Sequence, residues 1–169
     1  MSHFKSFMIF LLVSVSLMSC SRNDDQVKFE KEAYSAPAGY TETNFQGEVQ
    51  SEDPDDWRIS PLYQGTVRVN PPFPNPVTTD QPVNFEIEVI SVQQSINGLF
   101  VVTRNNDGTL KSPPLYERFE TLDQGLTTFT INPIEFGFQG SPEGARGLHR
   151  VFIFDGNQQM ISYGDIMVE

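Results

Sequence analysis

The sequence predicts an all-β fold: a single antiparallel β-sandwich of about seven strands, preceded by a segment that we expect to be largely unstructured. From Tyr63 onward, short runs rich in β-branched and aromatic residues are separated at intervals by Gly, Pro, Asn and Asp. Several of these runs alternate apolar and polar residues, as half-buried strands do. The chain of 169 residues also contains 14 phenylalanines, which suit pleated surfaces, and a single tryptophan.

The first strands of the predicted domain are the most regular. Residues 64–70 alternate, with Val67 and Val69 on one face. Residues 83–90 repeat the pattern, with phenylalanine, isoleucine and valine on one face and asparagine and glutamate on the other. After an Asn-Gly turn, residues 99–103 are apolar on both faces, which predicts a central strand.

The second half of the domain predicts further strands. Residues 110–119 contain a proline break and two weaker candidates. Residues 126–132 alternate again, whereas residues 134–146 are rich in Gly, Pro and charge and predict a long loop. Residues 148–154 are apolar on both faces, and residues 160–168 follow an Asp-Gly turn as the last strand.

About seven strands in roughly 105 residues match the rule for an immunoglobulin-like sandwich. A closed barrel would satisfy the same alternation, and the strand count favours the sandwich. The chain has no cysteine after Cys20, so packing alone must hold the domain together.

The amino terminus has the construction of a secretory signal. A positive charge at Lys5 precedes the apolar residues 7–13 and a shorter mixed stretch with small residues. Serines at positions 14, 16 and 19 and the polar residues that follow argue against a permanent membrane-spanning helix. We therefore expect residues 1–19 to be removed.

The residues at the end of this signal, Leu17-Met18-Ser19-Cys20, resemble the lipobox of bacterial lipoproteins. The resemblance implies that the Cys20 thiol carries a diacylglyceryl group, that Cys20 becomes the new amino terminus, and that the membrane is a partner through this lipid. The next residues, 21–25, resemble the polar and acidic export signal of surface lipoproteins of Bacteroidota-like bacteria. The expected location is the outer membrane, facing outward.

Cleavage divides the rest of the chain into a lipidated polar tether, residues 20–60, and the β-sandwich domain, residues 61–169. The tether shows no sustained helical or strand period and ends in an acidic run at residues 52–56. We expect its scattered aromatic residues to dock on the domain or on a partner, with docking on the domain favoured.

Charge excludes some classes of function. Removing residues 1–19 takes away Lys5, which leaves 10 basic and 22 acidic residues and a formal net charge of −12. Phosphate backbones would repel such a chain, so we expect no nucleic-acid partner. The sequence also lacks a glycine-rich phosphate loop and a cysteine pair, so no cofactor is expected.

Three groups of residues could carry chemistry. Asp53, Asp55 and Asp56 are candidate calcium ligands, but the run lacks the glycine and the distal glutamate of an EF-hand loop. Glu86 and Glu88 lie on one face of a predicted strand, about 6.5 to 7 Å apart, a spacing that glycoside hydrolases use. His149 is the one histidine left after cleavage, so a two-histidine metal site within one chain is excluded.

These considerations favour a non-enzymatic function: a surface-displayed interaction or structural module that engages an envelope protein or a glycan. An exposed aromatic patch would support it, formed by Phe136 and Phe138 or by the aromatic residues of the tether. The alternative is a surface polysaccharide hydrolase that uses Glu86 and Glu88.

Overall fold

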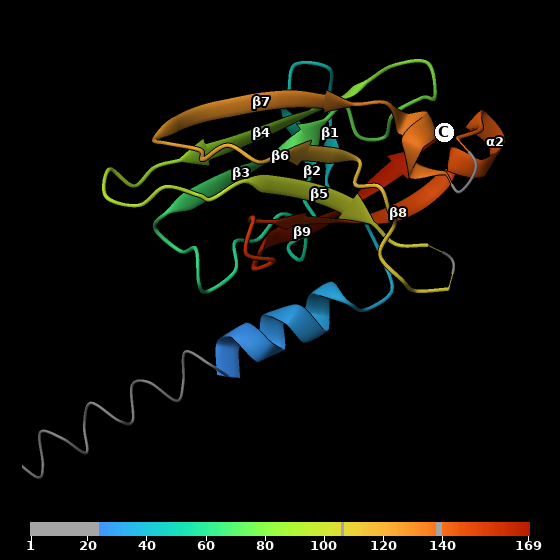
Figure 1. Ribbon diagram of the computed structural model, residues 1–169. Coiled ribbons are helices and arrows are strands. Elements are labelled where there is room, and N and C mark those ends of the chain that lie inside the picture. Colours follow the sequence, from blue (N-terminus) through green and yellow to red (C-terminus); the bar gives the residue numbers. More distant parts are fainter. Residues whose placement is uncertain (1–23, 106, 138–139) are drawn as a thin grey trace, which may run out of the picture.

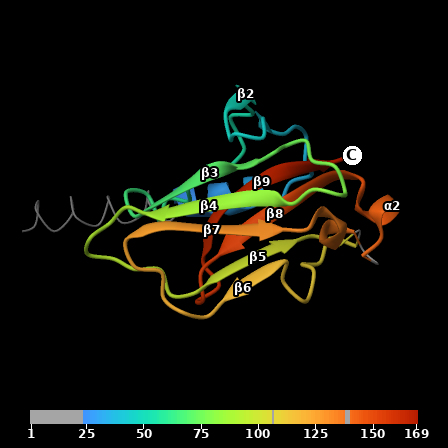
Figure 2. The same cartoon turned by 90° about the horizontal axis from the view of Figure 1, so that it is seen from above.

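The computed structural model describes residues 24–105, 107–137 and 140–169. The predicted signal peptide, the lipidation site Cys20 and Phe138 lie outside these ranges. The domain is a sandwich of two antiparallel β-sheets, and an N-terminal helix lies against the outer face of one of them (Figures 1 and 2). The predicted all-β sandwich is therefore correct, and the strands form two separate sheets instead of a closed barrel.

The first sheet has three strands in the order β3-β4-β7. They span Val67–Phe73 (β3), Val83–Val89 (β4) and Gly125–Ile131 (β7). The central strand β4 alternates strictly between buried and half-buried residues, so one face of the sheet packs on the core and the other faces solvent.

The second sheet has four strands in the order β6-β5-β8-β9. The strands are β5 (Leu99–Thr103), β6 (Tyr116–Arg118), β8 (Gly147–Phe154) and β9 (Met160–Val168). Strands β8 and β9 are buried along most of their length because this sheet is covered on both faces, by the first sheet on one side and by N-terminal residues on the other.

The core lies between the two sheets. Its fully buried side chains come from alternating strand positions of both sheets. They include Phe85, Ile87, Leu99, Ile153 and Ile166.

Residues 24–60 are folded onto the sandwich, so the prediction of a largely unstructured tether is wrong for them. Residues 24–33 are helical, and Gln26, Phe29 and Ala33 are buried along one face of this helix. The strands β1 (Glu42–Thr43) and β2 (Val49–Ser51) form a small hairpin. The segment shows no strong hydrophobic periodicity in its sequence because contacts with the second sheet stabilise its structure. At one of these contacts, Phe29 packs against Tyr163 with 5.1 Å between the ring centroids.

The end of this segment runs along the edge strand β9. The backbone N–H groups of Trp57 and Ser60 donate to the carbonyls of Tyr163 and Ile161, at 2.7 and 2.9 Å. Covering the backbone of an edge strand protects it from pairing with other chains. The expectation that the tether aromatics dock on the domain is confirmed for Trp57, which is buried.

Seven of the predicted strands are present, with small changes at their ends. Strand β3 extends through two prolines, and the weak candidate near Leu110 is reduced to an isolated bridge with Arg104. The predicted long loop at residues 134–146 contains two short helical turns, η1 (Pro133–Phe136) and α2 (Pro142–Ala145). Each begins with a proline after a capping side chain, Asn132 for η1 and Ser141 for α2.

Candidate functional site

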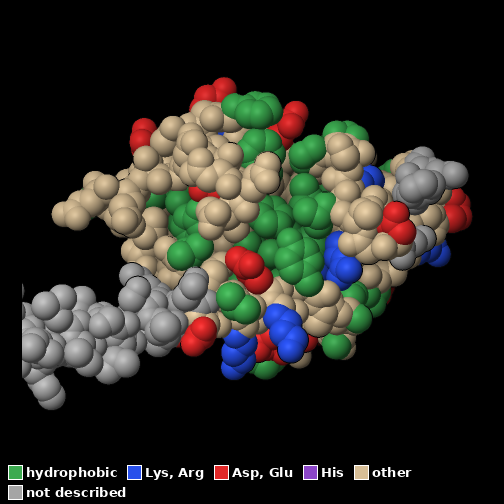
Figure 3. Space-filling model, turned by 60° about the horizontal axis from the view of Figure 1, so that its bottom comes forward, with side chains coloured by type: hydrophobic (Ala, Val, Ile, Leu, Met, Phe, Trp, Pro, Cys, Tyr) green, Lys and Arg blue, Asp and Glu red, His purple; other side chains and the backbone are tan. Residues whose placement is uncertain are grey.

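A hollow with apolar walls lies on the outer face of the β6-β5-β8-β9 sheet, beside the C-terminal end of the helix. We call it the aromatic hollow. Hydrophobic side chains gather on the face of the molecule on which the helix lies (Figure 3). The volume of the hollow is about 340 Å³, and its apolar lining consists of Tyr34, Phe100, Val102, Leu110, Pro114 and Phe154.

Strand pairing and ring packing position these side chains. Phe100 and Phe154 are direct neighbours across β5 and β8, so their rings lie on the same face of the sheet. Tyr34 follows the helix and stacks on the buried Phe152, with 5.2 Å between ring centroids. Phe119 meets Phe100 edge to face at 5.5 Å. The walls are thus held by packing on the domain before any ligand binds.

Two polar side chains at the hollow are already engaged within the protein. Asp155 accepts hydrogen bonds from the backbone N–H groups of Asn157 and Gln159, at 2.9 and 2.8 Å. Arg104 donates to the carbonyl of Tyr34 at 2.8 Å and holds that residue in place. The hollow therefore offers apolar and aromatic surface, with size and lining that suit a small ligand or a few side chains of a partner.

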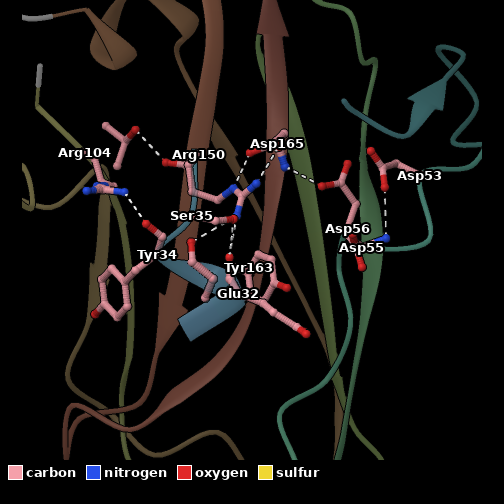
Figure 4. A network of polar contacts seen from close by, with 12 residues as sticks. Glu32, Tyr34, Ser35, Asp53, Asp55, Asp56, Arg104, Arg150, Tyr163 and Asp165 are labelled. Atoms are coloured by element: carbon pink, nitrogen blue, oxygen red, sulfur yellow. Dashed lines mark hydrogen bonds and ion pairs between the residues drawn. The ribbon is translucent and has the colours of Figure 1, made fainter. Parts of the chain in front are cut away.

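On the same face of the sheet, a buried polar network joins the helix to β8 and β9 (Figure 4). Arg150 forms a two-pronged ion pair with Asp165, from Nε to Oδ1 and from Nη2 to Oδ2, the second at 2.8 Å. Both side chains are almost fully buried. Arg150 Nη1 also donates to the carbonyl of Ala33 at 3.0 Å, and the guanidinium lies 5.0 Å from the ring centre of Tyr163. Arg150 thereby satisfies a carbonyl at the C-terminal end of the helix.

A second arginine fastens the helix from its exposed side. Arg58 donates to Glu32 Oε2 at 2.8 Å and to the hydroxyl of Tyr163. The hydrogen bond from Arg58 lowers the pKa of Glu32. Because more than a third of each side chain in the Arg58–Glu32 pair is exposed, this pair contributes less to stability than the buried pair.

Asp56 connects the N-terminal segment to β9. Its carboxylate accepts hydrogen bonds from the backbone N–H groups of Thr41, at 2.7 Å, and Asp165, at 3.0 Å. Burial raises the pKa of Asp56 to about 7, and the nearby carboxylates of Asp165 and Asp53 act in the same direction, while the two backbone hydrogen bonds oppose the shift.

The substitution Asp56→Asn tests this environment. Because the folded state raises the pKa of Asp56 from 3.8 to about 7, the stability that this group contributes is greatest below pH 4 and is lost as the pH rises toward 7. We expect the free energy of unfolding of the wild type, relative to Asp56→Asn, to decrease from about pH 4 to about pH 7 in urea titrations. A difference independent of pH would contradict the raised pKa.

The predicted calcium ligands Asp53, Asp55 and Asp56 all border one small hollow, which also contains Arg150 and Asp165, but their carboxylates do not converge as a metal site. Asp56 points into the buried network, whereas Asp53 Oδ1 accepts a hydrogen bond from the backbone N–H of Asp55 at 3.0 Å, within a local turn. Over residues 24–105, 107–137 and 140–169, no group of three or more His, Cys, Asp or Glu side chains could hold a metal ion.

The other candidates have partners within the fold. Glu86 and Glu88 lie on the outer face of the three-stranded sheet, where Asn70 and Arg68 donate to them at 2.9 and 3.1 Å across the strand pair. His149 Nε2 lies 2.6 Å from the carbonyl of Ala145, and burial lowers the pKa of the imidazole. These contacts fix the strand surface and the end of α2.

The prediction of an exposed aromatic patch at Phe136 is wrong, because this ring is buried. It packs beside His149, with 5.5 Å between the ring centroids. Its partner in that prediction, Phe138, lies outside the described residues. The other predicted source of exposed aromatic residues, the tether, does contribute, since Tyr34 is 44% exposed and lines the aromatic hollow.

The sequence analysis missed Phe100 and Phe154 as residues of the site. Their cross-strand pairing becomes visible only once β5 and β8 are known to be neighbours.

Comparisons with known proteins add no further constraint: no family matches the chain, and no curated protein is similar to it. Among the described residues, no helix is both long enough and apolar enough to span a membrane.

Proposed function

We propose that the protein is a lipid-anchored lipoprotein of the outer membrane, displayed on its outer side, whose β-sandwich is a non-catalytic interaction module. The partner is an envelope protein or glycan, and the aromatic hollow binds it. The observation that carries this proposal is the hollow itself, with rings from both the N-terminal segment and the second sheet around a volume of about 340 Å³.

The anchor is supported by the lipobox residues Leu17-Met18-Ser19-Cys20 at the end of a secretory signal. Two or three acyl chains would hold the protein at the membrane far more firmly than one. Because the helix that is fastened to the sandwich already includes residue 24, the domain would be connected to the lipid by only a few residues.

Binding in the hollow is supported by its construction. Large aromatic side chains dominate the energetics of interfaces, and at this site their positions are fixed by packing and strand pairing. The carboxylate of Asp155 is already hydrogen-bonded within the protein, so a partner would gain mainly from covering ring surface. Such a site does not require a metal or a reacting group.

The test compares the fragment Ser21–Glu169 with its Phe100→Ala variant in pull-downs from outer-membrane extracts and in glycan-binding assays. Phe45→Ala is the matched control, because this ring is 64% exposed and does not line the hollow. Loss of an anchoring aromatic costs about 2 kcal/mol or more, so we expect Phe100→Ala to weaken binding more than about tenfold and Phe45→Ala to leave it unchanged. Equal binding by both variants would refute the role of the hollow.

A further inference from the structure

One end of the sandwich gathers four connections next to the start of the described helix. We call it the entry end, and it consists of residues 61–66, 90–98, 119–124 and 155–159. Thr66 Oγ1 donates to Gln94 Oε1 at 2.6 Å, Ile96 pairs with Leu122 in an isolated bridge, and the backbone N–H of Gly156 donates to the carbonyl of Asn97, so the connections touch one another. The start of the described helix lies at this same end of the molecule in two perpendicular views (Figures 1 and 2).

Two of the connections at the entry end contain no charged residue. No Asp, Glu, Lys or Arg occurs in residues 59–67 or 89–103, although such residues make up 20% of the chain. The third connection contains Glu120 and Asp123, the fourth contains the buried Asp155, and Asp25 and Lys28 of the helix border this end. The connections at the opposite end contain several charged residues, among them Asp80, Arg104, Asp107, Lys111, Glu135, Glu143 and Arg146.

The entry end also exposes apolar side chains. Val92 is 76% exposed, Leu62 is 48% exposed and Ile90 is 36% exposed. Six of the ten large hydrophobic side chains that are exposed among the described residues belong to this end or to the elements that start there: Val27, Leu62, Ile90, Val92, Phe119 and Leu126. Exposed apolar side chains that gather at one end of a molecule mark a contact surface.

The chain that precedes the described residues identifies the partner of this surface. Residue 24 is four positions after Cys20, and an extended chain advances at most about 3.6 Å per residue, so residue 24 lies within about 14 Å of Cys20. The first helical turns are fixed beside the entry end, because Asp25 and Lys28 line one hollow together with Pro61 and Gln64. A lipid on Cys20 would therefore hold the entry end at the bilayer surface.

We infer that the entry end is a membrane-contact surface, whose occupant is the headgroup layer of the bilayer that holds the Cys20 lipid. Leu62, Ile90 and Val92 enter this layer, and the absence of charge in their two connections avoids both desolvation of ions and repulsion by anionic lipids. The inference rests on the proposed lipid anchor. It fixes the orientation of the domain: the charged end, with α2, points away from the membrane.

The test uses the full chain, processed and purified from membranes and reconstituted in vesicles of phosphatidylcholine and phosphatidylethanolamine. A new cysteine replaces Val92 and is labelled with a thiol-reactive NBD fluorophore, because acylation blocks the thiol of Cys20. The matched control carries the label at Glu143→Cys, an exposed residue of α2 at the other end of the domain. Phosphatidylcholine that carries a TEMPO nitroxide on its headgroup then quenches fluorophores that lie in the headgroup layer.

We expect the nitroxide lipid to quench the label at position 92 several-fold more strongly than the label at position 143. Mass spectrometry of the same preparation reports whether Cys20 carries the lipid. A lipidated protein whose two labels respond equally would overturn the membrane-contact surface and leave the anchor standing. A protein without lipid on Cys20 would overturn the anchor and this inference together.

Discussion

Replacing Arg150 with methionine is expected to lower the free energy of unfolding by about 3–5 kcal/mol. The substitution leaves the carboxylate of Asp165, which is 1% exposed, buried without its counter-ion. It also removes the hydrogen bond to the carbonyl of Ala33, so the helix loses part of its attachment to β8. Chemical unfolding followed by circular dichroism measures the loss.

Two variants separate the causes. Arg68→Ala removes an exposed ion pair with Glu88 on the other sheet and should cost less than about 1 kcal/mol. The double variant Arg150→Met with Asp165→Leu replaces the buried pair by apolar side chains and should recover much of the lost stability, because no unpaired charge remains. If the double variant were as unstable as Arg150→Met alone, the buried carboxylate would not be the source of the effect.

The strands of the sandwich could be predicted because their signal is local. In β4, buried residues alternate with half-buried ones from Val83 to Val89, and this period of two is visible in any sequence window of that length. The central strands β5 and β8 were equally recognisable, since both are apolar on both faces. The sandwich followed from the number of strands, and the structure has the seven that were expected.

The helix at residues 24–33 could not be predicted in the same way. Its buried face contains only Gln26, Phe29 and Ala33, which is too weak an apolar pattern to stand out. A helix of this length is marginal in isolation, so its stability depends on contacts with Tyr163 and Arg150. Those residues are more than 100 positions away in the sequence, and no short-range signal connects them with the helix.

The residues of the candidate sites could not be predicted for the same reason, because contacts between distant segments determine them. Phe100 and Phe154 belong to strands that were expected to be covered on both faces, and the aromatic hollow exists because the N-terminal segment covers that sheet only in part. Asp56 was considered as a calcium ligand, since an acidic run gives no indication of which carboxylate turns inward. In each case, contacts between segments that are distant in the sequence determine the surroundings of the side chain.

The N-terminal segment therefore connects the two proposed functions. The same sheet that forms the floor of the aromatic hollow also holds the helix that follows Cys20, through Arg150 and Tyr163. A domain held in this way would have a defined orientation at the membrane, which a largely unstructured tether of 40 residues would not provide. Variants that release the helix are thus expected to disturb the hollow, because Tyr34 would leave its wall.

Replacing Trp57 with alanine is expected to cost about 3–5 kcal/mol, as for other large aromatic residues in a core. The ring is 5% exposed, packs edge to face on Phe85 at 6.1 Å and lies over Gly164. A Cβ atom on Gly164 would lie 2.3 Å from Trp57 Cε2, so no side chain fits there while the indole is in place. We expect Gly164→Ala to cost about 1–3 kcal/mol by displacing the indole from β9.

The double variant Trp57→Ala with Gly164→Ala distinguishes this contact from a general loss of strand stability. Without the indole, the added methyl group at position 164 has room, so the double variant should unfold with nearly the same free energy as Trp57→Ala alone. Additive losses in urea unfolding would instead show that alanine harms β9 for a reason unrelated to Trp57. Strong coupling would show that the indole of Trp57 packs directly on the strand position without a side chain and helps to hold the N-terminal segment to the sandwich.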